Sequence, residues 1–391
     1  MRERSIIHLN IADFAVAVER LIDSSLKDYP LIIAPRGSTR AVVYDMSEEA
    51  FQAGIRKGMS LRKASRICKD SLILSPHFDR YERTMRELIK QALPYSPWVE
   101  FGERDGHLFI DITGTSRLFG PSVDVAWRLN KAIKKDLTLN PIWSVAPNKL
   151  LAKVATRLVK PFGEYIVGAG EEIDFLKPLH IGLLPGIEKT DLTRLREFNF
   201  TLVSEVLAMK PEHLSISFGK RAMFIYDTIR GIDPSPVLPV TKARSLVQAD
   251  HEFSEDTNDI EVLRSALYIL TEKICMVLRK KRKAAEKIKI EINYSDGMHN
   301  TAQMRIKPAS SNELTLYKNT KSLLDRAVKR RIRIRHMRLV CEKYVYPQIQ
   351  MGLFDSSKKN KKNESIIKTL DQIRSRFGYD AVKPGITKLA S

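Results

Sequence analysis

The sequence predicts an α+β protein with more than one domain, and three observations support this prediction. Its 391 residues exceed the usual size of one domain. Short apolar or alternating stretches, typical of strands, recur between segments with helical spacing. A proline-rich stretch, 233–239, separates a helical region from a second region of mixed helices and strands. We therefore expect at least two packed cores joined by a linker.

The first region predicts strands that alternate with helices. Strand-like stretches are expected at 5–12, 31–33, 98–103, 107–113 and 142–146, and helical spacing at 13–22, 47–68, 78–92, 121–135 and 148–158. Gly54 and Gly58 interrupt the segment 47–68, which therefore predicts a small inserted subdomain. Glycines and prolines break a further helical region, 171–232.

The second region repeats this mixture. Helices are expected at 258–282, 312–328 and 364–377, and strands at 288–294, 301–307 and 331–346. The last helix is short and carries a small apolar stripe, which packs either on the protein itself or on a partner. The sequence leaves both alternatives open.

Composition excludes several protein classes. With 43% hydrophobic and 29% charged residues, the chain is neither disordered nor fibrous. No apolar run approaches the roughly 20 residues of a membrane-spanning helix, and Asn10, Asp13 and Glu19 interrupt any signal-peptide core. The three cysteines are too widely spaced for a metal knuckle and too few for a disulfide scaffold. We expect reduced thiols, a cytoplasmic, nucleoid-associated protein and no membrane partner.

Charge indicates a nucleic-acid partner. Lys plus Arg number 66 against 46 Asp plus Glu, a net charge of +20, and residues 241–345 hold 23 of these cations against 13 acids. Because strand side chains alternate, Arg331, Arg333 and Arg335 would share one strand face, with Lys329 and Arg330 just before it. These residues predict contacts to DNA phosphates without sequence specificity. The alternative is a solvated sheet face.

Several stretches, taken in their order, resemble the Y-family (translesion) DNA polymerases. They are GIRKGMSLRKASRIC at 54–68, PNKLLAKVATRLVKPFG at 147–163, LLPGIEKTDLTRLREFNF at 183–200, FGKRAMFIYDTIRGID at 218–233, INYSDGMHNTAQMRI at 292–306 and RRIRIRHMRLV at 330–340. The resemblance implies a ferredoxin-like palm at 1–30 and 77–170, fingers at 31–76, a helix-hairpin-helix thumb at 171–232, a linker at 233–242, an α/β little finger at 243–346 and a tail at 347–391.

The resemblance also assigns a metal site to this sequence, but the residues at its positions are not the carboxylates that bind metal in the family. Polymerases of this family hold two divalent metals with three carboxylates, and an alignment without gaps puts Asn10, Gly106 and His107 at those positions. Glu48 and Phe51 stand where a tyrosine and an arginine would grip the incoming triphosphate. An amide, a glycine and an imidazole do not form the anionic oxygen cage that Mg²⁺ requires. This pattern resembles the non-catalytic ImuB-type branch, which implies an adaptor with no cofactor.

The alternative is an active, error-prone lesion-bypass polymerase whose two-metal site is rearranged around Mg²⁺. Asp13 and Asp105 lie close to the expected positions, and Asp111 is a carboxylate that is kept at a position usually structural in the family. A slip of one residue turns every strand side chain to the opposite face, so the register decides between the two alternatives.

Two further motifs each have a functional and a structural interpretation. Lys149 is either a relic phosphate contact or a lysine at a helix start. Gly186, in the stretch LLPGI, resembles a hairpin whose backbone N–H groups bind a phosphate. Glu188 stands where a second glycine is often found, so a purely structural turn is the alternative.

The tail carries a short linear motif. Gln350, Leu353 and Phe354 resemble the Gln-x-x-Leu-Phe pentapeptide that binds the bacterial sliding clamp, and the alternative is an ordinary apolar pair in a loop. Together the resemblances imply DNA repair, mutagenesis and the SOS response. The implied partners are primer–template or damaged duplex DNA, the clamp, a catalytic translesion polymerase and a RecA-like accessory protein.

Overall fold

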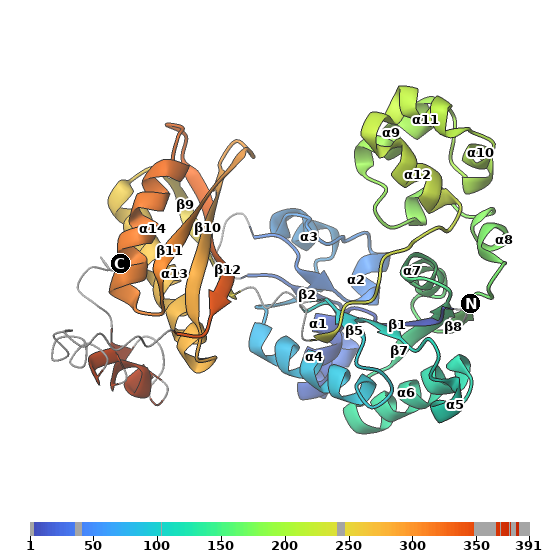
Figure 1. The fold of residues 1–391 in the computed structure, drawn as a ribbon, viewed down its shortest axis with the longest axis horizontal. Helices are drawn as coiled ribbons and strands as arrows, with labels where there is room; N and C mark the ends of the chain where they lie inside the picture. The colour runs from blue at the N-terminus through green and yellow to red at the C-terminus, as the bar shows by residue number, and fades with distance from the viewer. Residues whose placement is uncertain are drawn as a thin grey trace. The chain divides into compact units, whose positions relative to one another are not determined.

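The chain forms two compact units, residues Met1–Ala243 and Arg244–Ser391 (Figure 1). The computed structural model describes residues 4–35, 41–102, 104–240 and 247–347, and in the tail 365–367, 369–374, 376, 381 and 382. The predicted α+β fold class is confirmed: each unit combines a β-sheet with packed helices.

A five-stranded sheet forms the palm of the first unit. Its order is β5-β6-β1-β7-β8, from Val99–Phe101, His107–Asp111, Ile6–Ile11, Pro141–Ala146 and Glu164–Ile166. The central strand β1 is antiparallel to both β6 and β7, and its register places Asn10 opposite His107 and Ile6 opposite Asp111. Every residue of β1 is buried because helices cover both faces of the sheet.

The two faces of the palm sheet carry different helices. Ile7, Leu9 and Ile11 belong to the core that includes α1 (Phe14–Ile22), α4 (Phe78–Ala92) and α6 (Ser122–Leu137). Ile6 belongs to the core of α7 (Lys149–Leu158) on the other face. Because side chains alternate along a strand, His8 and Asn10 lie on the α7 side of the sheet.

A small subdomain is inserted after α1 and its following 3-10 turn, η1 (Ser24–Asp28). It contains a sheet of order β3-β2-β4 and two short helices: β2 Leu31–Ile33, β3 Asp45–Met46, β4 Leu72–Leu74, α2 Glu48–Gln52 and α3 Leu61–Ile67. Ile32, Ala50, Ile55 and Ala64 form its separate core. Ser47 and Ser60 cap the two helices, since each accepts a bond from a backbone N–H in the first turn.

Short helices form the thumb, seen at the upper right of Figure 1. They are α8 Glu172–Leu176, α9 Lys189–Glu197, α10 Val203–Leu207, α11 Pro211–Phe218 and α12 Ala222–Ile229, with 3-10 turns η2 Ile181–Leu183 and η3 Gly219–Arg221. The remaining helix of the first unit, α5 (Ser116–Phe119), precedes α6 in the palm.

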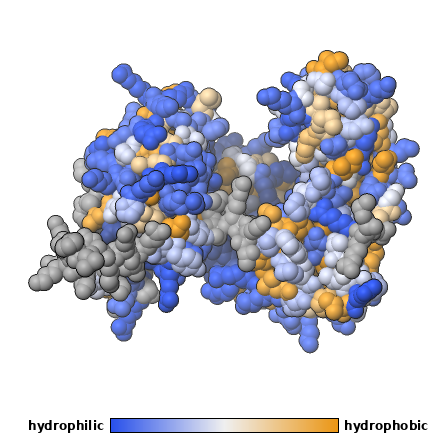
Figure 2. Space-filling model, viewed as in Figure 1, coloured by the Kyte–Doolittle hydropathy of each residue, from blue (hydrophilic) through white to orange (hydrophobic). Residues whose placement is uncertain are grey.

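The second unit, Arg244–Ser391, contains the segment expected to be the little finger, and we keep that name for it. Its antiparallel sheet has the order β11-β10-β12-β9, from His299–Ser310, Ala284–Tyr294, Ile334–Val345 and Val247–Thr257. Two helices, α13 (Ile260–Lys280) and α14 (Glu313–Ala327), cover one face, onto which Ile288, Ile290 and Ile292 of β10 are buried. The other face is polar, since Lys287, Lys289 and Glu291 of β10 alternate with these buried residues. Figure 2 shows a mostly hydrophilic surface over this unit.

The structure differs from the sequence prediction in two places in this unit. Strand β9 was not expected, because its Asp and Glu residues are uncommon in strands. The predicted strand 331–346 begins only at Ile334, so the prediction that Arg331, Arg333 and Arg335 share a strand face is wrong. Arg331 and Arg333 are exposed in the loop before β12, and Arg335 alone of the three lies in the strand.

None of the described helices combines the length and the apolar character needed to cross a membrane.

Candidate functional site

The pairing of β1 with β6 builds the site where the sequence comparison placed the metals. Asn10 and His107 are direct partners in this antiparallel pair, so their side chains emerge on the same face, toward α7. Gly106 precedes β6, and its carbonyl accepts a hydrogen bond from the N–H of Ile11 at 3.0 Å. The positions therefore meet as the resemblance implied, but with neutral groups.

A pair of imidazoles occupies this face. His8 Nε2 and His107 Nδ1 share a hydrogen bond of 3.0 Å, and His8 Nδ1 shares another of 2.7 Å with Thr156 Oγ1 of α7. The Phe109 ring stacks on His8 with centroids 4.3 Å apart. Burial, followed by repulsion from His107 and Lys153, holds the pKa of His8 well below its usual value. Burial likewise lowers the pKa of His107 to about 3, so both rings are neutral at pH 7.

The two remaining positions are also unsuited to a metal. Asn10 is only 1% exposed, and its Nδ2 finds no hydrogen-bond partner among the described residues. Gly106 has a φ of +74°, and a Cβ at this position would lie 3.0 Å from the Phe14 side chain. An aspartate at 106 would therefore combine backbone strain with a close contact.

The three carboxylates that could rescue the site have different surroundings, and Asp111 lies away from Asn10 and His107 along β6. Asp13 has left-handed φ and ψ before α1, and burial, together with repulsion from Asp45, raises its pKa to about 6. Asp105 is exposed on the turn between β5 and β6, where it accepts the N–H of His107 at 3.1 Å. Asp111 lies at the other end of β6, four residues and roughly 13 Å from His107. Asp111 accepts the N–H of Thr113 at 2.9 Å.

Two Mg²⁺ ions, which the fold family implies, do not fit these residues. The donors on this face are one amide and two imidazoles, whereas Mg²⁺ prefers anionic oxygens. Within the described ranges of the chain, no group of three or more His, Cys, Asp or Glu side chains could hold a metal.

The surrounding charge is positive. Lys153, Arg157 and Lys160 follow the same side of α7 and its end, and each has a lowered pKa. Burial is the first cause for all three, and mutual repulsion adds to it for the two lysines. A cationic surrounding disfavours a divalent cation further.

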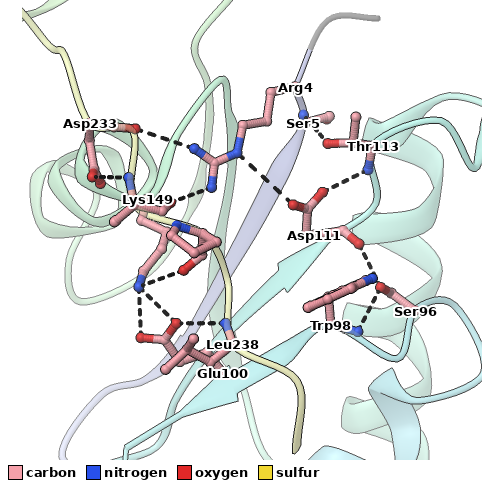
Figure 3. Close-up of polar contacts among 12 residues, drawn as sticks. Arg4, Ser5, Ser96, Trp98, Glu100, Asp111, Thr113, Lys149, Asp233 and Leu238 are labelled. Atoms are coloured by element: carbon pink, nitrogen blue, oxygen red, sulfur yellow. Dashed lines mark hydrogen bonds and ion pairs between the residues drawn. The ribbon is translucent and has the colours of Figure 1, made fainter. Parts of the chain in front are cut away.

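Lys149 lies on the edge of this face, where its charge is already paired. Its Nζ donates to both oxygens of Glu100, at 2.7 and 2.8 Å, and to the carbonyl of Pro236 at 3.5 Å (Figure 3). Glu100 also accepts the N–H of Leu238 at 3.0 Å. These contacts support the structural interpretation of Lys149 over a phosphate contact.

The same region shows that residues 231–240, which we call the strap, are held on the palm. Arg4 donates to the carbonyls of Asp233 and Ser235, and Asn148 Nδ2 donates to that of Gly231 at 2.7 Å. Arg4 also lies 4.0 Å from the Asp111 carboxylate, as Figure 3 shows. The first part of the predicted linker is therefore fixed in place by side chains of the palm.

The thumb hairpin is filled by its own side chains. Gly186 has a φ of +83°, and a Cβ there would lie 2.5 Å from the Phe224 ring. Arg221 donates to the carbonyl of Gly186 at 2.7 Å. Asp191 accepts the N–H of Glu188 at 2.9 Å, so a carboxylate takes one donor that a phosphate would use. The contacts favour the structural turn.

The basic cluster of the little finger divides into paired and unpaired cations. Arg330 pairs with Asp296 at 2.7 Å and Arg335 with Glu252 at 3.8 Å. Lys329, Arg331 and Arg333 have no acidic partner within the described ranges. Gln350, Leu353 and Phe354 lie outside the described residues.

Sequence reasoning missed two residues that shape the site. His8 could have been found, because it lies two residues before Asn10 on one strand and therefore on the same face. Glu100 could not, because its contact with Lys149 depends on a crossing of β5 and α7 that no local pattern encodes.

Comparisons with known proteins agree with this architecture. The model of the impB/mucB/samB family matches residues 9–157, and that of the family's C-terminal domain matches residues 244–351. A DNA polymerase IV of Dehalococcoides mccartyi (strain CBDB1) is 28% identical over 388 residues, covering 99% of this chain and 98% of the relative. A DNA polymerase IV of Desulfatibacillum aliphaticivorans is 28% identical over 386 residues, covering 98% and 97%.

A solved structure supports the same fold. The Y-family DNA polymerase chimera Dbh-Dpo4(243-245)-Dbh superposes with a TM-score of 0.76 at 21% identity, covering 87% of this chain and 99% of the chimera. The two family matches together span more than half of the chain and include the palm, the fingers and the little finger. The chain therefore belongs to the impB/mucB/samB family, the Y-family DNA polymerases.

Proposed function

We propose that this Y-family protein binds DNA in translesion synthesis as an adaptor and does not itself join nucleotides. The observation that supports the proposal is the donor set on the α7 face of the palm, where Asn10, Gly106 and His107 stand in place of three carboxylates. Nucleotide joining in this family is a two-metal phosphoryl transfer, in which the metals activate the attacking oxygen and stabilise the leaving one. Without the carboxylates, the palm keeps its shape and loses that chemistry.

DNA binding rests on charge and on the relatives. The chain has a net charge of +20, and both relatives described above are named DNA polymerases. Lys329, Arg331 and Arg333 are the cations whose charge is available for phosphates near the start of β12. Contacts of this kind grip any DNA sequence, because phosphates carry no base information.

Recruitment of partners rests on the tail motif. Gln350, Leu353 and Phe354 would bind a bacterial sliding clamp, with the two apolar side chains in a pocket and the amide fixing the register. The adaptor would then bring a catalytic translesion polymerase, with a RecA-like accessory protein, to a damaged template. Clamp pull-down with Leu353→Ala plus Phe354→Ala tests this step: binding should be lost while DNA affinity stays within about twofold.

Primer extension tests the main proposal. Purified protein is incubated with primer–template DNA, all four dNTPs and Mg²⁺ or Mn²⁺, and DNA binding is measured on the same preparation. We expect DNA binding without primer extension. Robust primer extension by the wild type that disappears in the Asp105→Ala variant would overturn the proposal that the protein is a non-catalytic adaptor.

The second candidate is an active, error-prone lesion-bypass polymerase that uses Mg²⁺. The names of the relatives, DNA polymerase IV, favour it, since those proteins are named for catalysis. It requires Asp13, Asp105 and Asp111, or a subset of them, to converge when DNA and nucleotide bind. Loss of extension in any one of the three alanine variants would identify the carboxylates used.

A further inference from the structure

The little finger has a second buried surface, on the side of α13 turned away from the sheet. Leu263, Leu270 and Ile274 face the sheet core. Tyr268, Glu272 and Arg279 recur at helical spacing on a different stripe of the same helix. Glu272 is only 3% exposed although it is charged, so something must cover it.

The cover is the C-terminal helix, whose described residues lie between 365 and 376. Arg374 forms an ion pair with Glu272, and the side chains are 2% and 4% exposed. Asp371 accepts two hydrogen bonds from Arg279, both of 2.7 Å, and Arg279 also donates to Glu313 at the start of α14 at 2.7 Å. Asp371 and Arg374 are three residues apart on the helix, so one face makes both contacts.

This surface lies far from the unpaired cations. The loop 329–333 precedes Ile334, which pairs with Thr257 at the end of β9, and α13 begins three residues after Thr257. Arg279 is nineteen residues further along α13, roughly 28 Å at 1.5 Å per residue. The cationic loop and the docked helix therefore lie toward opposite ends of α13.

We propose that the C-terminal helix is a latch. It is anchored on α13 through Glu272 and Arg279, toward the end of that helix opposite to the loop 329–333, which would hold DNA. The DNA binding rests on the proposed function, whereas the docking itself does not. The occupant of the α13 surface is this chain's own helix, because its Asp and Arg are complementary to the Arg and Glu beneath them.

Hydrogen exchange measured by mass spectrometry on the full chain tests the latch. In the wild type the amides of 365–367 and 369–374 should be protected. In Asp371→Ala plus Arg374→Ala they should exchange at least about tenfold faster, while the DNA dissociation constant stays within about twofold. Thr369→Ala, an exposed change on the same helix, should leave protection unchanged.

A milder variant is also needed, because Arg374→Ala deletes one member of a buried ion pair with Glu272 and could destabilise the whole unit. Asp371→Asn leaves Arg279 paired with Glu313 and should raise exchange of the C-terminal helix alone. Arg331→Ala plus Arg333→Ala should weaken DNA binding and leave the exchange unchanged. Unprotected wild-type amides in 365–367 and 369–374, or a latch variant that weakens DNA binding tenfold, would overturn the proposal. Absence of DNA binding in a protected wild type would overturn only the proposed function.

Discussion

His107, which stands at one of the expected metal positions, shares a hydrogen bond with His8, and both rings are neutral at pH 7. Their neutrality follows from burial, since a charged imidazole loses hydration when it is taken out of water. The cations of α7 act in the same direction. The palm thus keeps a polar, well-packed interior at this position without needing an ion to neutralise it.

This pair predicts acid sensitivity. The folded-state pKa of each ring lies below the unfolded value near 6.5. The contribution of the rings to the free energy of unfolding is therefore fully present above about pH 6.5. It is lost as the pH falls toward the folded-state pKa, which is about 3 for His107. We expect a loss of about 1–2 kcal/mol from His107 between pH 6.5 and 5, and a further loss in the same direction from His8. Urea unfolding at several pH values measures this. An equally steep pH dependence in His8→Asn plus His107→Asn would contradict it.

The backbone geometry at Gly106 predicts that Gly106→Asp alone does not restore a metal-binding site. Gly106→Asp should destabilise the protein by about 1–3 kcal/mol, because a Cβ would meet Phe14 and the backbone φ of +74° disfavours a side chain. Gly297→Asp is the matched control, since its φ is +84° and its Cβ would have open space. Chemical denaturation should give a clearly smaller loss for the control. Equal losses would mean that the Phe14 contact is relieved at little cost.

At the scale of the elements, the contact with the strap changes the role that we assign to Lys149. Lys149 connects α7, β5 and the strap through Glu100 and Pro236, and both members of the ion pair are largely shielded. From sequence alone, Lys149 could be an ordinary lysine at a helix start, or, in a DNA-binding family, a residue that contacts phosphate. Its partners instead indicate a structural role, in which the palm holds the chain that leaves the thumb.

Lys149→Met should therefore cost stability and spare DNA binding. We expect a loss of about 1–3 kcal/mol, because Glu100 keeps its burial and loses its cation, with DNA affinity within about twofold of wild type. Lys135→Met, an exposed lysine on α6, is the control and should change neither. Denaturant unfolding and fluorescence anisotropy measure the two effects. A tenfold loss of DNA affinity at unchanged stability would favour the phosphate contact.

At the scale of the whole molecule, ion pairs among the described residues neutralise part of the positive charge, and the polar face of one sheet shows this most clearly. On the polar face of the little-finger sheet, Lys287 pairs with Glu342, Lys289 with Glu291 and Arg338 with Asp250. This face therefore neutralises much of its own charge. The loop 329–333 contributes cations without an acidic partner among the described residues at one end of the sheet. We therefore predict that this loop contacts DNA phosphates.

Salt dependence tests that assignment. Each phosphate contact releases counterions and adds about 0.9 to the slope of log affinity against log salt. Arg331→Ala plus Arg333→Ala should thus lower the slope by about 2. Arg330→Ala removes a cation already paired with Asp296 and should lower it less. An unchanged slope in the double variant would exclude the loop as a phosphate contact.

Much of the fold was predictable because local patterns carry it. Helix α4 spans the predicted residues 78–92, and β1, α6 and α7 differ from prediction by a few residues at their ends. Strand β9 was missed because its charged residues are stabilised by pairing with β12, a contact distant in sequence. The late start of β12 was missed because alternating arginines imitate a strand while the chain is still in a loop.

The same division holds for the site. The family resemblance was enough to assign Asn10, Gly106 and His107 to the expected metal positions, and the antiparallel pair of β1 and β6 makes Asn10 and His107 direct partners. The sequence did not show whether Asp13, Asp105 and Asp111 could replace them. That depended on the left-handed backbone at Asp13, on the turn that carries Asp105 and on the length of β6 up to Asp111, and tertiary packing decides all three. The partners of Lys149 and Arg374 were likewise decided by tertiary contacts, since an ion pair between residues many positions apart leaves no trace in the local pattern of either segment.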